Sequence, residues 1–254
     1  MHKASRVIGR VASIFVVLSV LLATPLHAQS ERWWNHVEND RRSQLIEELA
    51  QGADPNVKDE SGLPAIMFAI QHQSWDAYEL LRQHRQIDVN AVNAHDETPL
   101  MYLAILGETA RMQQLIKQGA EVRRLGWTPL HYAASKGNAE TAQFLLKQGA
   151  LVNAPAPDGT SPLMMAALSG DRATVELLLK NGADASAVNL QQLTAADWAR
   201  SKNNTRIADY LENYAKGIHT PAAEAPTPAS GQVEAPATEE GSSGSRYFDL
   251  DRFN

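Results

Sequence analysis

Residues 126–154 read GWTPLHYAASKGNAETAQFLLKQGALVNA and predict two short antiparallel helices. Thr128 offers a hydroxyl that can cap the free backbone N–H groups of a first helix. Pro129 follows at the first helical position, where a missing N–H costs nothing. A second helix is expected over 139–148, and Gly149 provides the left-handed conformation that commonly ends a helix. Helices of roughly a dozen residues or fewer are marginal in isolation, so this pair requires neighbours to bury its apolar side.

Copies of this pattern recur along the chain. When the residues that begin each first helix are aligned, successive copies are separated by 34, 30, 33 and 33 residues. The second helices end at Gly-Ala pairs that keep the same step. Such a period predicts a stack of similar units, each packed only against its neighbours. The aligned first-helix positions are Ala65, Pro99, Pro129, Pro162 and Ala195.

The repeated segments resemble the ankyrin-repeat family, whose unit is a β-turn finger followed by a helix pair. The resemblance rests on TPLHYAASKG and LLKQGA in one unit and on SPLMMAALSGD and LLLKNGAD in the next, and it covers roughly residues 33–214. It implies an all-α solenoid of about six helix-pair units with β-turn fingers. It also implies a non-enzymatic module that binds a protein through its finger loops and concave helix face.

The end units depart from the repeat. Trp33 and Trp34 fall where a first helix should lie and are expected to cap the open end of the core, with exposed binding residues as the alternative. In the last unit, Asp197 and Arg200 replace the usual His and Ala and make a polar outer face. Between the second and third units, residues 84–86 lengthen the turn that normally holds a terminating Gly.

The N-terminus has the three-part layout of a secretory signal peptide. Three basic residues precede an apolar run over 11–23, and the small residue Ala28 stands before Gln29. The run has 13 residues, whereas a membrane-spanning helix needs roughly 18 or more. We therefore expect cleavage after Ala28, export to the periplasm of a bacterium and no stable membrane anchor. An uncleaved anchor is the alternative.

Composition narrows the function classes. The chain has no cysteine, which excludes disulfides, thiolate metal sites and a lipid-modified N-terminus. Its formal charge is −6, and removal of residues 1–28, with three basic and no acidic residues, gives −9. The basic residues are scattered among more numerous acids. A protein partner is therefore expected rather than nucleic acid, whose phosphates require clustered Lys and Arg.

The chain divides into four segments. These are a signal peptide at 1–28, an ankyrin-repeat domain at 29–216, a linker at 217–245 and an aromatic C-terminal peptide at 246–254. The linker consists mainly of Pro, Ala, Thr, Glu, Ser and Gly. Disorder is predicted for it, because so few large apolar side chains cannot offset the entropy of ordering. The C-terminal peptide is expected to dock on a folded surface in cis or in trans, with incidental aromatic residues as the alternative.

No catalytic, cofactor or metal motif is present in the sequence. It lacks a G-x-S-x-G elbow, a phosphate-binding loop and an H-E-x-x-H pair. His131 is expected to form structural hydrogen bonds near the turn and to the neighbouring unit. The acidic pairs Asp59-Glu60 and Asp249-x-Asp251 are interpreted as solvated loop charges. We therefore predict no enzyme activity.

One aromatic or Met residue recurs in each first helix. In a stacked solenoid this position packs against the next unit, so a place in the core is expected. The alternative function is a small-molecule binder or enzyme that uses this column. Its members are Phe68, Tyr102, Tyr132, Met165 and Trp198.

The repeat register also predicts a partner-binding surface. It comprises the residue between each finger Gly and the capping Thr, and the pair that follows each Ala-Ala position. Trp127 stands out beside a shortened finger, because Trp near Arg is typical of interface hot spots. Alternatively, Trp127 folds down to fill the gap left by the missing finger residues. The candidate partner-binding residues are Trp127, Arg123, Arg124, Lys136, Glu97, His72 and Leu106, with Tyr247, Phe248 and Phe253 of the C-terminal peptide.

Overall fold

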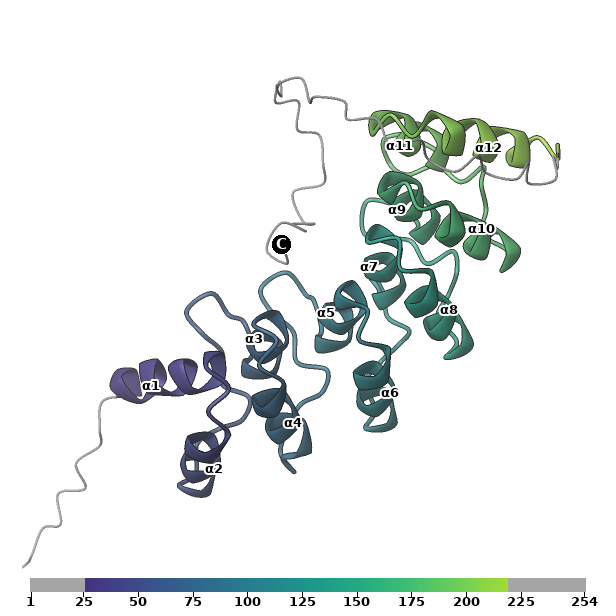
Figure 1. The fold of residues 1–254 in the computed structure, drawn as a ribbon. Helices are drawn as coiled ribbons and strands as arrows, with labels where there is room; N and C mark the ends of the chain where they lie inside the picture. Colours follow the sequence, from purple (N-terminus) through teal and green to yellow (C-terminus); the bar gives the residue numbers. More distant parts are fainter. Residues whose placement is uncertain (1–25, 219–254) are drawn as a thin grey trace, which may run out of the picture.

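The structure, a computed structural model, describes residues 26–218, with side chains from residue 31 onward. The predicted signal peptide up to residue 25, the linker from residue 219 and the whole C-terminal peptide lie outside the described residues. Within the described range the chain forms six helix pairs that stack in a row (Figure 1). The fold is therefore the all-α solenoid that the repeat predicts.

Each pair contributes one helix to a first row and one to a second row. Helices of the first row pack directly on one another along the stack, and each also packs on its own partner in the second row. The first row contains α1 (Leu26–Glu38), α3 (Ala65–Gln71), α5 (Pro99–Leu106), α7 (Pro129–Ser135), α9 (Pro162–Ser169) and α11 (Ala195–Ser201). The second row contains α2 (Arg42–Ala50), α4 (Trp75–Gln83), α6 (Thr109–Lys117), α8 (Ala139–Lys147), α10 (Arg172–Lys180) and α12 (Thr205–Ala215).

The ends of the helices follow the predicted caps. Thr128 is the N-cap of α7 and Pro129 its first residue, while α8 ends at Lys147, just before Gly149, which has a φ of +89°. The turn between α7 and α8 also requires glycine. Gly137 there has a φ of +64°, and a Cβ on it would lie 2.5 Å from the Cβ of Asp171 in the next unit. Gly137 therefore both reverses the chain between α7 and α8 and allows the next unit to pack closely against this turn.

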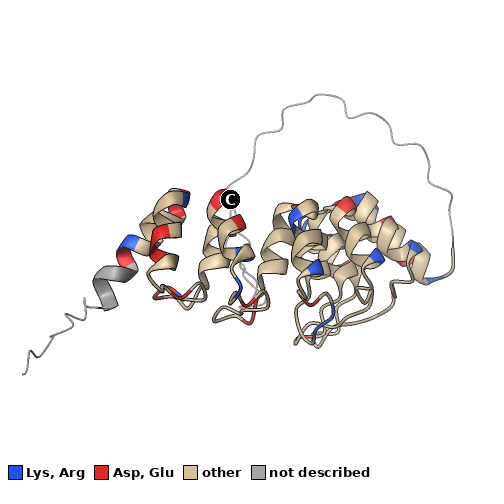
Figure 2. Cartoon of the chain, turned by 90° about the horizontal axis from the view of Figure 1, so that it is seen from below, with Lys and Arg blue, Asp and Glu red and all other residues tan. Residues whose placement is uncertain are grey.

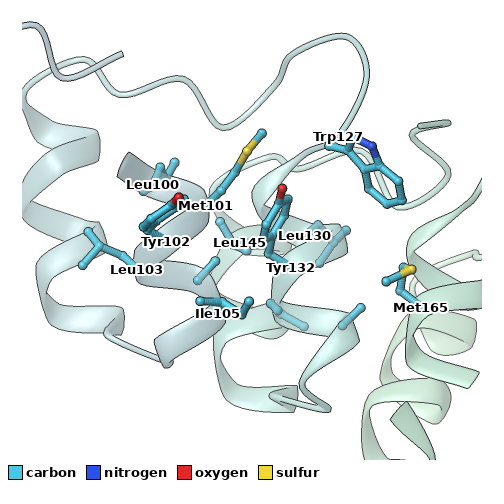
Figure 3. Packing of buried hydrophobic residues seen from close by; sticks show 14 of the residues in the cluster. Leu100, Met101, Tyr102, Leu103, Ile105, Trp127, Leu130, Tyr132, Leu145 and Met165 are labelled. Carbon is cyan, nitrogen blue, oxygen red and sulfur yellow. The ribbon is translucent and has the colours of Figure 1, made fainter. Parts of the chain in front are cut away.

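One continuous hydrophobic core runs through the stack. The aromatic and Met column belongs to it: Tyr102, Tyr132 and Met165 are at most 1% exposed, which confirms the predicted packing role (Figure 3). Phe68 and Trp198, nearer the two ends, are half-buried.

At the N-terminal end, Trp33 is buried and Trp34 is half-buried. The Trp34 ring lies 5.0 Å from the ring of Phe68. Both residues therefore pack on the end of the core, as a cap does.

A finger loop precedes each first helix from α3 onward, and these fingers project from one side of the row (Figure 2). Four of them share a tight hairpin, in which the N–H of one residue bonds the carbonyl of the residue four places later. The fourth finger, which is shorter, has no such bond among the described residues. We number the fingers by their unit: second (54–64), third (88–98), fourth (121–128), fifth (151–161) and sixth (184–194).

A row of polar side chains ties the base of each finger to the next unit. Asn90 donates from its Nδ2 to the Gly119 carbonyl (3.0 Å) and accepts from the Glu121 N–H (2.9 Å). Asn56 and Asn153 bridge their neighbours in the same two-bond manner. In the shortened fourth finger Arg123 takes this place. We call these four residues the bridging ladder.

The ends of the described region differ slightly from the predicted domain limits. Helix α1 begins at Leu26, inside the predicted signal peptide, and α12 ends at Ala215, followed by Gly217 with a φ of +75°. None of the helices within residues 26–218 has the length and apolar character needed to cross a membrane.

Candidate functional site

The residue that follows each finger Gly faces inward, so the first set of predicted surface positions is largely wrong. Glu97 is only 1% exposed and Trp127 only 8%. Among the equivalent residues, Leu63 and Thr160 are also buried, and only Leu193 in the sixth finger is exposed.

Trp127 fills space beneath the shortened finger. Its ring meets the ring of His131 edge-on, with 5.2 Å between the centroids, and it lies beside α7 in the core cluster (Figure 3). The prediction of an exposed hot spot at Trp127 is therefore wrong. The alternative applies, because a finger with fewer residues leaves a gap that a large side chain can occupy.

The two arginines beside Trp127 bond within the chain. Arg123 donates from its Nε to the Gly149 carbonyl (2.6 Å), the bond that asparagine makes elsewhere in the bridging ladder. Arg124 reaches the third finger, where it bonds the backbone oxygen (2.8 Å) and carboxylate (2.6 Å) of Asp96. Both guanidinium groups thus hold the fourth finger in place.

The remaining predicted positions line the first helices where these end. His72 and Lys136 are exposed and Leu106 is half-buried. The His72 ring stacks on Phe68 with 4.2 Å between the centroids, and its Nδ1 lies 3.8 Å from a carboxylate oxygen of Glu38. These three residues and Arg123, which is also exposed, are the part of the predicted surface within the described residues that stays accessible. Tyr247, Phe248 and Phe253 lie outside the described residues.

Glu97 is the centre of a buried polar network. Its carboxylate accepts hydrogen bonds from Asn93 Nδ2 (2.6 Å) and from the Tyr132 hydroxyl. Asn93 Nδ2 also donates to the Tyr102 hydroxyl (3.2 Å). A buried carboxylate is stable only when donors surround it. Because Tyr132 belongs to the fourth unit and Glu97 to the third, the network joins the two units.

His131 has the structural role predicted for it. Burial lowers its pKa from 6.5 to about 4, although the hydrogen bond with the Thr160 carbonyl opposes this shift. The neutral ring carries its proton on Nε2, which donates to that carbonyl (3.0 Å), and Nδ1 accepts from the hydroxyl (2.9 Å) and N–H (3.2 Å) of Thr128. The ring therefore caps α7 and bonds the next unit.

The tips of three adjacent fingers carry exposed apolar residues that the register did not identify. Leu125 is 94% exposed and Leu190 is 76% exposed. Pro157 lies between them: a Cβ on Gly126 would be 3.7 Å from its ring, and the Leu190 N–H bonds the Asp158 carbonyl (2.8 Å). We call Leu125, Pro157 and Leu190 the apolar finger edge. The sequence signal that could have identified them is an apolar residue at the tip of a finger turn. Leu125 stands two positions before Trp127, and Pro157 and Leu190 stand three positions before Thr160 and Leu193.

A pocket of about 310 Å³ opens between the second and third units. The second and third fingers form two of its sides, and α3 and α5 form its base. Its lining residues are Asp59, Ser61, Leu63, Phe68, Gln71, Asn93, Ala94, His95 and Tyr102.

The acidic pair Asp59-Glu60 is not a carboxylate dyad. Asp59 Oδ1 accepts from the Ser61 N–H (2.9 Å) and hydroxyl (2.7 Å) and from the Leu63 N–H (2.8 Å), so it stabilises the turn of its own finger. Glu60 points to solvent. Across residues 26–218 no cluster of His, Asp and Glu suited to a metal ion occurs.

Comparison with known proteins gives one consistent family. A model described as ankyrin repeats (3 copies) matches residues 34–124 and 85–156, and a model of a single ankyrin repeat matches residues 158–190. Among curated proteins, the human transient receptor potential cation channel subfamily A member 1 is 28% identical over 98 residues. That match covers 39% of this chain but only 8% of the channel.

Among solved structures, the chain is similar to an ankyrin repeat domain from Acinetobacter baumannii AYE, known from a crystal structure. The TM-score is 0.61 at 26% sequence identity. The match covers 74% of this chain and 98% of that domain.

Proposed function

Because the chain belongs to the ankyrin-repeat family, we propose that it is an exported, non-enzymatic module that binds a protein partner through its finger loops and concave helix face. Ankyrin repeats indicate a scaffold for protein–protein interaction, since stacked units present a long continuous surface. The basic start, short apolar run and small residue before Gln29 support export to the periplasm.

The apolar finger edge is the observation that carries the proposal. Isolated surface leucines are common, but an exposed apolar row over adjacent loops is typical of an interaction site. Leu125 is almost fully exposed at the tip of a finger whose base is fixed by Arg123, Arg124 and Trp127. A fixed base places this leucine without a large ordering cost on binding.

The concave face adds polar contacts to this edge. His72 and Lys136 are exposed at the ends of α3 and α7. Within the aromatic column, Tyr132 and Met165 are at most 1% exposed, so a ligand could reach them only if the units separated. A protein partner is therefore favoured over a small molecule bound in the column.

Affinity capture tests the proposal. The mature protein, immobilised and incubated with periplasmic extract, is expected to retain a partner that the Leu125→Ser/Leu190→Ser variant loses. Leu151→Ser is the matched control, because Leu151 is 52% exposed but lies outside the finger tips. Substitutions at such exposed positions usually change stability by no more than about 0.5 kcal/mol. Equal capture by the finger variant and the wild type would show that the finger edge does not bind the partner.

A further inference from the structure

The pocket lies between the second and third units, whose first helices pack less extensively than those of the third and fourth units. Residues 84–86 lengthen the connection, and the spacing between these units is 34 residues. Helix α3 contacts α5 less extensively than α5 contacts α7. The fingers above remain joined, since Lys58 Nζ bonds the Val92 carbonyl (2.8 Å). The result is a recess that is closed above by fingers and has aromatic rings in its lining.

The lining of this pocket combines negative charge with aromatic rings. Asp59 is half-buried there, and none of the described residues that line the pocket is Lys or Arg. Phe68 and Tyr102 contribute rings from α3 and α5. Asn93, at the wall, is bonded to the buried carboxylate of Glu97, which brings a second acidic group close behind the lining.

We propose that this pocket accepts the side chain of a Lys or Arg presented by an extended segment of the protein partner. The inference rests on the proposed function and names the chemistry of one contact. A cation gains from a carboxylate in a recess, where water screens the charge less. An apolar side chain would remove water from Asp59 without replacing its hydrogen bonds, and an acidic one would be repelled.

A small cation provides the direct test. Propylguanidinium, titrated into the full chain, is expected to shift the NMR resonances of Phe68 and Asn93 in a saturable manner. The resonances of Leu151, which lies in a later unit, should stay unchanged. Butanol, which has a similar chain length but no charge, should produce no saturable shift. Equal shifts with both compounds would overturn the charge-based assignment.

Asp59→Asn isolates the charge. The turn should survive, because Asn93 and Asn189 hold the equivalent position in the third and sixth fingers and accept the same kind of backbone bonds. We expect propylguanidinium to bind about three- to five-fold more weakly, the effect of one partly exposed ion pair. Asp184→Asn is the matched control, since Asp184 Oδ1 also accepts from the N–H and hydroxyl of a serine two residues later. Equal affinity in wild type, variant and control contradicts the proposal.

The chain itself contains a competing occupant. Arg252 lies in the C-terminal peptide, outside the described residues. If Arg252→Gln in the full chain shifts the Phe68 and Asn93 resonances before any ligand is added, the occupant is this peptide, and the assignment to a partner is overturned. Unchanged resonances support a cation that comes from a partner.

The captured partner separates this inference from the proposed function. Failure of the wild-type protein to retain any partner would reject the function and leave the propylguanidinium result standing. Equal retention of the partner by wild type and Asp59→Asn would reject the pocket contact while the function stands. Reduced retention by Asp59→Asn, and not by Asp184→Asn, is the expected result.

Discussion

The hydroxyl of Tyr132 is the single atom whose removal should most weaken the joint between the third and fourth units. It donates to the buried carboxylate of Glu97. Tyr132→Phe leaves the ring in the core but removes a donor from a charged acceptor, so we expect a loss of about 1.5–3 kcal/mol in unfolding free energy. Urea denaturation measures it. Tyr210→Phe, in a half-buried ring beneath Arg172, should change stability little; an equal loss in both variants would refute the special role of the network.

His131 should make the stability depend on pH. Its pKa is about 4 when folded and 6.5 when unfolded, so both states are neutral above pH 6.5 and only the unfolded state gains a proton between these values. Stability should therefore fall as the pH drops from 6.5 to 4, by a total of about 3 kcal/mol. His131→Met removes this contribution, and Met101 and Met164 show that Met fits the same position. The measurement is urea unfolding at pH 7 and pH 4.5.

The comparison with a surface histidine sharpens this test. His72 is exposed, so His72→Gln should leave most of the pH dependence intact. Carboxylates also titrate over this range, but they are common to all three proteins and cancel in the differences. A His131→Met variant with the same loss between pH 7 and pH 4.5 as the wild type would contradict a neutral buried imidazole.

At the scale of elements, the turn between α7 and α8 requires glycine, although Gln73 and Asn203 adopt a similar positive φ in the corresponding turns of other units. Gly137→Ala introduces a left-handed alanine, which costs about 1–2 kcal/mol, and places a Cβ 2.5 Å from Asp171 Cβ. Overpacking of this kind adds about 1–3 kcal/mol. Gly182→Ala is the control: its φ is +88°, but no atom lies within 4 Å of the new Cβ. The urea midpoint should fall clearly further for Gly137→Ala, and equal midpoints would exclude the steric contribution.

The helices could be predicted from the sequence because their ends depend on local chemistry. Thr128, Pro129 and Gly149 determine where the backbone can begin and end a helix, whatever surrounds them. The finger tips could not be assigned in this way. Asp96 and Gln192 adopt positive φ values of 60° where other fingers have glycine. The residues that follow them differ in exposure, since Glu97 is buried and Leu193 is exposed. The inward position of Trp127 depends on the length of a loop and not on its own identity.

The candidate site depended even more on contacts between units. The sequence predicts Arg123 and Arg124 as partner-binding residues because a cluster of Arg and Trp has the composition of a hot spot, but it does not reveal that both side chains also bond within the chain. Their acceptors, Gly149 and Asp96, are 26 and 28 residues away in the sequence. The pocket likewise requires two units to be placed side by side before it exists. Only the accessible ends of the first helices, such as His72 and Lys136, followed from register alone.

At the scale of the whole molecule, export predicts a defined mature N-terminus. We expect the protein purified from cells to begin at Gln29, because the basic start, 13-residue apolar run and Ala28 have the layout of a cleavable signal peptide. Intact-mass spectrometry of the periplasmic fraction measures this. Ala28→Arg should block processing, since the cleavage site requires a small residue, whereas a change of Gln29 to Ser should not. A cytosolic protein that retains Met1 would contradict the prediction.

The bridging ladder determines which repeat units such a protein could gain or lose by recombination of its gene. Asn56, Asn90 and Asn153 each make the same two hydrogen bonds to the start of the next unit. If recombination copies or deletes one such unit, the new neighbours can therefore form the same pair of bonds. The unit that starts at the fourth finger is different. Arg123 makes a single bond, and Arg124 and Trp127 are fitted to the third finger and to His131. A chimaera spliced at this junction would need all three residues to be transferred together, which makes the fourth finger the joint least open to such exchange.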